Sequence, residues 1–97
     1  MPPEAPQASI RHEPAARRFA TDIDGDAAFI SYREMAGRVL DFDHTYVPPS
    51  ARGSGIASRL TAHALMFARD GGYRVVPSCP FVAAYLRRHP EYRDLLA

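Results

Sequence analysis

The chain has 97 residues, of which 46% are hydrophobic and 24% charged; these values fit one globular domain and leave no room for two independent cores. A domain of this size buries only about 60–65% of its unfolded surface, so a substrate pocket must be shallow or shared with a bulky ligand. Twelve basic and eleven acidic residues give a net charge of +1, which argues against attraction of nucleic acid by bulk charge.

Cysteine usage and hydropathy limit the cellular setting. The single cysteine, Cys79, cannot form an intramolecular disulfide, and no apolar run reaches the length of a membrane span. The start of the chain lacks the charged-then-apolar pattern of a signal peptide. We therefore expect a soluble cytoplasmic protein with no membrane partner.

The N-terminal part of the chain is predicted to contain a tail and three strands. Residues 1–9 are rich in proline and small polar residues, which predicts a flexible tail before a single domain at residues 10–97. Alternating and β-branched segments predict strands at residues 18–23, 28–35 and 39–47. The short turns between them predict an antiparallel meander.

The hydrophobic period then changes from 2 to about 3.6, which predicts a helix over residues 56–70 that ends at the glycines 71–72. A fourth strand is predicted at residues 73–77, and a second helix at residues 81–88, after Pro80. A strand–helix–strand step implies a right-handed crossover, with the fourth strand parallel to the third. The order β-β-β-α-β-α predicts an α/β fold whose mixed, mostly antiparallel sheet has helices packed on it.

The junction between the third strand and the long helix is the most informative stretch. Gly53 and Gly55 remove side chains where the chain enters a helix, so backbone N–H groups can approach a phosphate, and Arg52 adds positive charge. No lysine follows as in a Walker loop, and Ser58 stands where the dinucleotide fingerprint needs glycine. These residues leave two alternatives open: a phosphate or pyrophosphate site, and a tight turn that needs glycine for its geometry alone.

The segment Arg52-Gly53-Ser54-Gly55-Ile56-Ala57 resembles the acyl-CoA signature of the GCN5-related N-acetyltransferase (GNAT) superfamily, Gln/Arg-x-x-Gly-x-Gly/Ala. The flanking residues are similar to its small single-domain YjdJ-type branch. The blocks that recur there in this order are His44-Thr45-x-Val47-Pro48, Gly53-x-Gly55-Ile56-Ala57, Val76-Pro77-x-Cys79-Pro80-Phe81-Val82, and Tyr85 with His89-Pro90-Glu91-Tyr92. The similarity covers about residues 17–96. It implies a minimal GNAT-like fold, acetyl-CoA as cosubstrate without a metal, and transfer of the acetyl group to an amine.

The resemblance also implies roles for individual residues. The pantetheine arm is expected beside Val47, and the CoA pyrophosphate at Arg52, Gly53, Ser54, Gly55, Ile56 and Ala57. Cys79 is expected near the acetyl end of CoA, where its thiol either accepts the acetyl group or shapes the pocket. Tyr85 stands where many GNAT enzymes carry the tyrosine that protonates the departing CoA thiolate, although it also fits the core stripe of the second helix.

Strict alternation sorts the side chains of the third strand onto two faces, with Asp41 and Asp43 on one and Leu40, Phe42, His44 and Tyr46 on the other. His44 is a candidate base that takes a proton from the acceptor ammonium or from Cys79, and a hydrogen-bonded packing residue is the alternative. Asp41 and Asp43 are weaker candidates for a base that acts through water.

The sequence therefore leaves three alternative functions. The first is an N-acetyltransferase, the second a non-catalytic CoA-binding sensor or adaptor, and the third a protein-interaction domain whose glycine turn is only structural. The branch lacks the helices that larger relatives place between strands 1 and 2, so the acceptor site should be open or completed by a second molecule. The acceptor amine, on a small molecule or a protein, is left open, as is a choice between monomer and weak homodimer.

Overall fold

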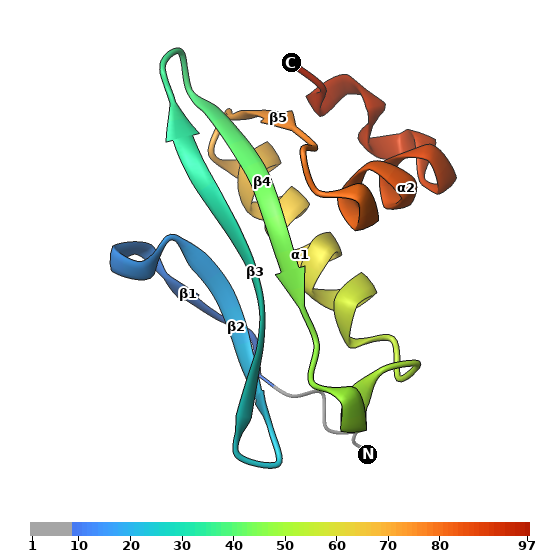
Figure 1. Ribbon diagram of the computed structural model, residues 1–97. Helices are drawn as coiled ribbons and strands as arrows, with labels where there is room; N and C mark the ends of the chain where they lie inside the picture. The colour runs from blue at the N-terminus through green and yellow to red at the C-terminus, as the bar shows by residue number, and fades with distance from the viewer. Residues whose placement is uncertain (1–8) are drawn as a thin grey trace, which may run out of the picture.

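The computed structural model describes residues 9–97, so nearly all of the predicted tail at residues 1–9 lies outside the described residues. Five strands form one sheet in the order β1-β2-β3-β4-β5 (Figure 1). They are β1 (Arg11–Glu13), β2 (Arg18–Ile23), β3 (Asp26–Met35), β4 (Val39–Tyr46) and β5 (Arg74–Val76). The first four pair antiparallel, and β5 pairs parallel to β4. The helices are α1 (Ile56–Asp70) and α2 (Pro80–Arg88), with the 3-10 helices η1 (Pro14–Ala16), η2 (Pro49–Ala51) and η3 (Pro90–Leu95).

The α/β fold, the mixed sheet and the parallel crossover are confirmed, but the predicted element order is wrong in one respect. β1 precedes the three predicted strands and was not expected, because three residues ended by Pro14 are too short to show alternation. His12 holds β1 in place. Its ring stacks on Phe19 at 4.4 Å between centroids, and its Nε2 lies 2.6 Å from the Tyr32 hydroxyl.

The hydrophobic core lies between one face of the sheet and α1. The sheet contributes large buried side chains and α1 contributes a buried stripe at helical spacing: Phe19, Ile30, Leu40 and Phe42 from the sheet, and Leu60, Ala64, Leu65 and Ala68 from the helix. Figure 1 shows α1 behind the sheet and no described helix in front of β3 and β4, so the second sheet face is open to solvent. Within residues 9–97, no helix combines the length and apolar character needed to cross a bilayer.

Candidate functional site

The turn between β4 and α1 is held in shape by hydrogen bonds of its own. Gly53 and Gly55 have φ angles of 86° and 88°, the left-handed region that favours glycine. The Ser54 hydroxyl and backbone N–H both donate to the Ala51 carbonyl. The Arg52 Nε donates to the Val47 carbonyl at 3.0 Å and ties the turn to the end of β4.

A hollow of about 280 Å³ lies at this turn. Its walls come from the turn, the first residues of α1 and the start of α2: Val47, Ala51, Arg52, Gly53, Gly55, Ile56, Ala57, Ser58 and Phe81. All residues predicted to hold CoA line the hollow except Ser54, whose hydroxyl is occupied within the turn. Sequence reasoning missed Phe81 as a wall, although its place directly after Pro80 in the Cys79 block was a usable signal.

The hollow is suited to an anion. The first hydrogen bond of α1 runs from the Arg59 N–H to the Gly55 carbonyl at 3.1 Å, so the N–H groups of Ile56, Ala57 and Ser58 have no backbone acceptor among the described residues. A Cβ on Gly53 or Gly55 would meet no atom within 4 Å, which shows open space around the turn. The exposed Arg52 and the positive end of α1 both favour a bound negative group.

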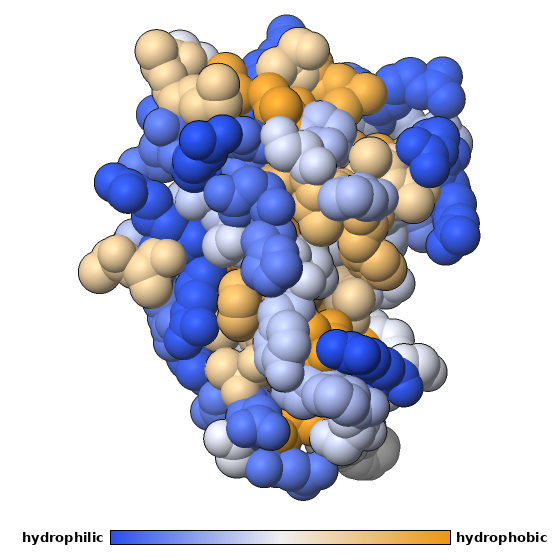
Figure 2. Space-filling view, viewed as in Figure 1, coloured by the Kyte–Doolittle hydropathy of each residue, from blue (hydrophilic) through white to orange (hydrophobic). Residues whose placement is uncertain are grey.

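β4 and β5 separate beside this hollow. β5 pairs with β4 only over Val39–Asp41, and the last bond across runs from the Cys79 N–H to the Phe42 carbonyl at 2.9 Å. Beyond that point no strand of residues 9–97 pairs with β4 on its β5 side, because the segment after Cys79 forms α2. Figure 2 shows the surface indented between α2 and the turn that follows β4. Val47, the residue directly after β4, and Phe81 of α2 both line the hollow, so it lies beside the end of β4.

Cys79 lies where the two strands begin to separate. It is 5% exposed and occupies the N-cap position of α2. Its Sγ is 3.4 Å from the Thr45 Oγ1, and within the described part of the chain no histidine or carboxylate contacts it. The thiol thus faces the interior beside the free edge of β4, and among the described residues its side-chain hydrogen-bond partner is Thr45, not a base.

A β-bulge changes the side on which His44 lies. Tyr32 pairs with Phe42 and Ser31 pairs with His44, so Asp43 is an extra residue in β4. Because Ser31 and Tyr32 point to opposite faces of β3, His44 and Phe42 do too. The prediction that His44 shares the face of Leu40 and Phe42 is therefore wrong.

The bulge moves His44 to the open sheet face, where its ring lies 5.9 Å from that of Phe29. Tyr46 is on the same face, with its ring 5.8 Å from Phe29. Thr45 points inward instead and meets Cys79. The structure thus separates His44 from Cys79 by the thickness of the sheet, and removes His44 as a base that acts directly on that thiol.

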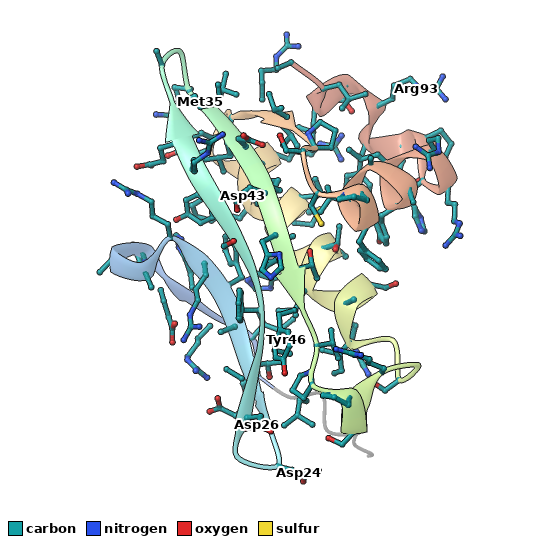
Figure 3. The ribbon with its side chains drawn as sticks, viewed as in Figure 1. Asp24, Asp26, Met35, Asp43, Tyr46 and Arg93 are labelled. Atoms are coloured by element: carbon teal, nitrogen blue, oxygen red, sulfur yellow. The ribbon has the colours of Figure 1, made fainter. Side chains whose placement is uncertain are left out.

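The carboxylates of β4 also differ from each other. The Asp41 side chain is 4% exposed and accepts a hydrogen bond from the Arg33 Nη2 at 2.9 Å. Burial acts to raise the pKa of Asp41, but Ser78 and Arg33 outweigh it and leave this pKa below its ordinary value. Asp43 is labelled in Figure 3; its side chain is 34% exposed and accepts a hydrogen bond from the Ser31 hydroxyl at 2.8 Å. Asp43 is thus more accessible to a solvent-borne proton than Asp41.

Tyr85 lies one helical turn after Phe81 on α2. It is half-buried, does not line the hollow, and stacks on His89 with ring centroids 3.9 Å apart. Burial raises the pKa of the Tyr85 hydroxyl, and Tyr92 and Glu91 act in the same direction. The phenol therefore keeps its proton at neutral pH, and its role toward a CoA thiolate stays a prediction. Across residues 9–97, no three His, Cys, Asp or Glu side chains are grouped to hold a metal ion.

Comparison with known proteins identifies the family of this fold and site. Residues 18–95 match the family model described as GCN5-related N-acetyl-transferase. Protein NATD1 of Mus musculus is 30% identical over 83 residues, which cover 84% of this chain and 76% of the mouse protein. Protein NATD1 of Xenopus tropicalis is 30% identical over 89 residues, covering 88% of this chain and 82% of the frog protein.

A solved structure has the same fold. The NMR solution structure of a GCN5-like protein from Staphylococcus aureus superposes with a TM-score of 0.70 at 23% identity, covering 93% of this chain and 88% of that one. At that level of identity the likeness concerns the fold. Because the family model spans most of the chain, the protein belongs to the GCN5-related N-acetyltransferase family.

Proposed function

We propose that the chain binds acetyl-CoA at the turn formed by residues 52–57 and transfers the acetyl group to an amine. The observation that carries the proposal is the position of the hollow, which lies at the unpaired N–H groups of α1 and includes Val47, the residue directly after β4. The pyrophosphate would lie against the N–H groups of Ile56 and Ala57 and the guanidinium of Arg52. The thioester arm would pass between Val47 and Phe81 toward Cys79.

The chemistry requires three contributions from the protein. The acceptor ammonium must lose a proton, the thioester carbonyl must be polarised, and the departing thiolate must gain a proton as the C–N bond forms and the C–S bond breaks. Backbone N–H groups on the free edge of β4 are suited to polarise the carbonyl. His44 and Asp43 lie on the open face beside the bulge, where an approaching amine can pass its proton to them directly or through water.

Direct attack by the amine is better supported than an acetyl-Cys79 intermediate. Cys79 is buried, its polar contact is with Thr45, and His44 lies across the sheet. A thiol needs a base or a lowered pKa to act as a nucleophile at neutral pH. We infer that Cys79 shapes the pocket at the acetyl end, and that Tyr85, on the same side of α2 as Phe81, donates the proton to the thiolate.

CoA binding is the first point to test. At about 100 times its Kd, a ligand adds about 2.7 kcal/mol to the stability of the folded chain, which for this size raises the Tm by more than about 10 °C. Ser58→Glu places a negative charge at the N-terminus of α1, where it should leave the ligand-free Tm unchanged or slightly raised. The same charge should weaken CoA binding at least about tenfold by repelling the pyrophosphate.

Met66→Glu, at an exposed site further along α1, serves as the matched control and should keep the affinity for CoA. Thermal shift and calorimetric titration measure both variants. No change of Tm at millimolar CoA would remove both the enzyme and the sensor interpretation, leaving a glycine turn with a structural role. An equal loss of affinity in both variants would place the ligand elsewhere.

Turnover separates the enzyme from the sensor or adaptor. We expect free CoA thiol to be released from acetyl-CoA in the presence of at least one member of a panel of small amines and lysine-containing peptides. Binding of CoA without release across that panel would favour the sensor. The cytoplasmic location and the choice between monomer and weak homodimer stay predictions.

A further inference from the structure

A second hollow, of about 250 Å³, lies on the other side of α2. It is lined by Pro77, Ala83, Leu86, Arg87, Arg93 and Leu96. Ala83, Leu86 and Arg87 have the i, i+3, i+4 spacing of one helix face. Phe81, which lines the proposed CoA hollow, lies about 200° around α2 from Ala83. The two hollows therefore use opposite faces of the same helix.

The chain after α2 folds back to build the second wall of this hollow. The Ala97 N–H donates to the Val75 carbonyl at 2.9 Å, and the Arg74 Nη1 donates to the Leu96 carbonyl at 3.2 Å. These bonds fix Leu96 beside β5, while its side chain stays 36% exposed. The hollow thus has an apolar floor that is held by backbone hydrogen bonds and is open to solvent.

The rim of the hollow carries positive charge without a partner. Neither Arg87 nor Arg93 has a carboxylate within 4.0 Å in the part of the chain that the structure describes. The acidic side chains of η3 are engaged elsewhere, Asp94 with Arg69 at 2.5 Å and Glu91 with His89 at 3.6 Å. Arg87 lies in the last turn of α2 and Arg93 in the last turn of η3, where a cation also suits the helix dipole. Figure 3 shows the Arg93 side chain extending outward from η3.

The geometry points to a docking site for an acidic segment of another protein, which inserts one apolar side chain between Arg87 and Arg93. One leucine-sized side chain can occupy the floor. Acidic residues on either side of that anchor then pair with the two arginines, a residue type enriched at protein interfaces.

The site can be tested with short peptides, independently of CoA. The probe is the acetylated and amidated peptide Asp-Glu-Leu-Glu-Asp, titrated into the full chain while amide shifts are followed by ¹⁵N NMR. We expect saturable shifts at Ala83, Leu86 and Leu96 and none at Gly53 or Gly55. A peptide with lysine in place of each acidic residue, and one with serine in place of leucine, should bind at least about fivefold more weakly.

Matched variants test which arginines bind the acidic peptide. Arg87→Gln combined with Arg93→Gln should lower the affinity for the acidic peptide about fivefold or more. Arg88→Gln changes the neighbouring arginine outside the hollow and should leave this affinity unchanged. Absence of saturable shifts, or equal binding of the lysine peptide, would overturn the proposal. Binding of N-acetylleucine as tight as that of the peptide would overturn it in favour of a small-carboxylate site. All these results are obtained without acetyl-CoA, so they do not depend on the proposed function.

Discussion

The two halves of β4 belong to one strand but have different surroundings. Residues 39–42 lie between β3 and β5, and Leu40 and Phe42 are fully buried beneath α1. Residues 43–46 begin with the bulge, pair with β3 only, and include no fully buried side chain. One strand thus supplies the core in its first half and the candidate site in its second, and the change occurs within one residue.

The difference has a local cause on each side of β4. Cys79 makes the last backbone bond to β4, and Pro80, which has no N–H, then begins α2 and leads the chain away. On the other side the extra residue Asp43 shifts the register. On the β5 side, residues 43–46 consequently have no strand partner within residues 9–97, while the side chains of His44 and Tyr46 face solvent.

The largest expected contrast between the halves is in stability. Phe42→Ala should lower the free energy of unfolding by about 3–5 kcal/mol, because it leaves a cavity at a fully buried position. Tyr46→Ala, on the open face and 36% exposed, should cost less than about 1 kcal/mol. Urea unfolding at neutral pH measures both.

Phe42→Leu provides a second measurement in case Phe42→Ala fails to fold in a domain of this small size. It should cost clearly less than the alanine variant and still more than Tyr46→Ala. A cost for Tyr46→Ala equal to that of Phe42→Leu would show that the second half is also part of the folding core.

Much of this contrast could be predicted from the sequence. The periods of 2 and 3.6 located β2, β3, β4 and α1, because the buried faces of long segments leave a repeated pattern. The glycines and prolines that bound them located β5 and α2. The glycine turn was located because a left-handed backbone and a side-chain-free helix start both demand glycine. The resemblance named six of the residues that line the hollow at this turn, but not Ala51, Ser58 or Phe81.

The bulge could not be predicted in the same way. Alternation was extended through Asp43 as if each residue of β4 had one partner, and this placed His44 on the wrong face. A bulge adds a residue without a distinctive residue type, so it is visible only when the partner strand is known. β1 was missed for a related reason: its three residues are specified by the contacts of His12 with Phe19 and Tyr32, not by a local pattern.

The second expected contrast is in turnover. His44→Ala should lower kcat at least about tenfold and flatten the pH–rate profile near neutrality, because the open-face base is lost, while the affinity for CoA stays unchanged. Cys79→Ala should reduce kcat only a few-fold if the thiol shapes the pocket. CoA-thiol release and CoA titration measure the two quantities. Loss of nearly all activity in Cys79→Ala, together with a hydroxylamine-sensitive acetyl adduct on the unaltered chain, would contradict direct attack.

The smallest expected contrast is in acid sensitivity, between Asp41 in the first half and Asp43 in the second. The pKa of Asp41 is lower in the folded chain than its ordinary value, so the unfolded chain takes up this proton more readily. The resulting stabilisation is complete above the unfolded pKa of about 3.9 and is lost as the pH falls through the folded pKa. Asp41→Asn removes this titration, and its free energy of unfolding should fall less steeply between about pH 5 and pH 2.

Asp43→Asn is the matched control, because it removes a carboxylate from the same strand at a side chain that is 34% exposed. Urea unfolding of both variants, repeated across this pH range, compares the two carboxylates. Equal flattening in both variants would mean that the bulge does not separate a structural carboxylate from an accessible one. A flatter slope in Asp41→Asn alone would show that the shorter contact of Arg33, at 2.9 Å to Asp41 against 3.8 Å to Asp43, is the one that stabilises the folded chain.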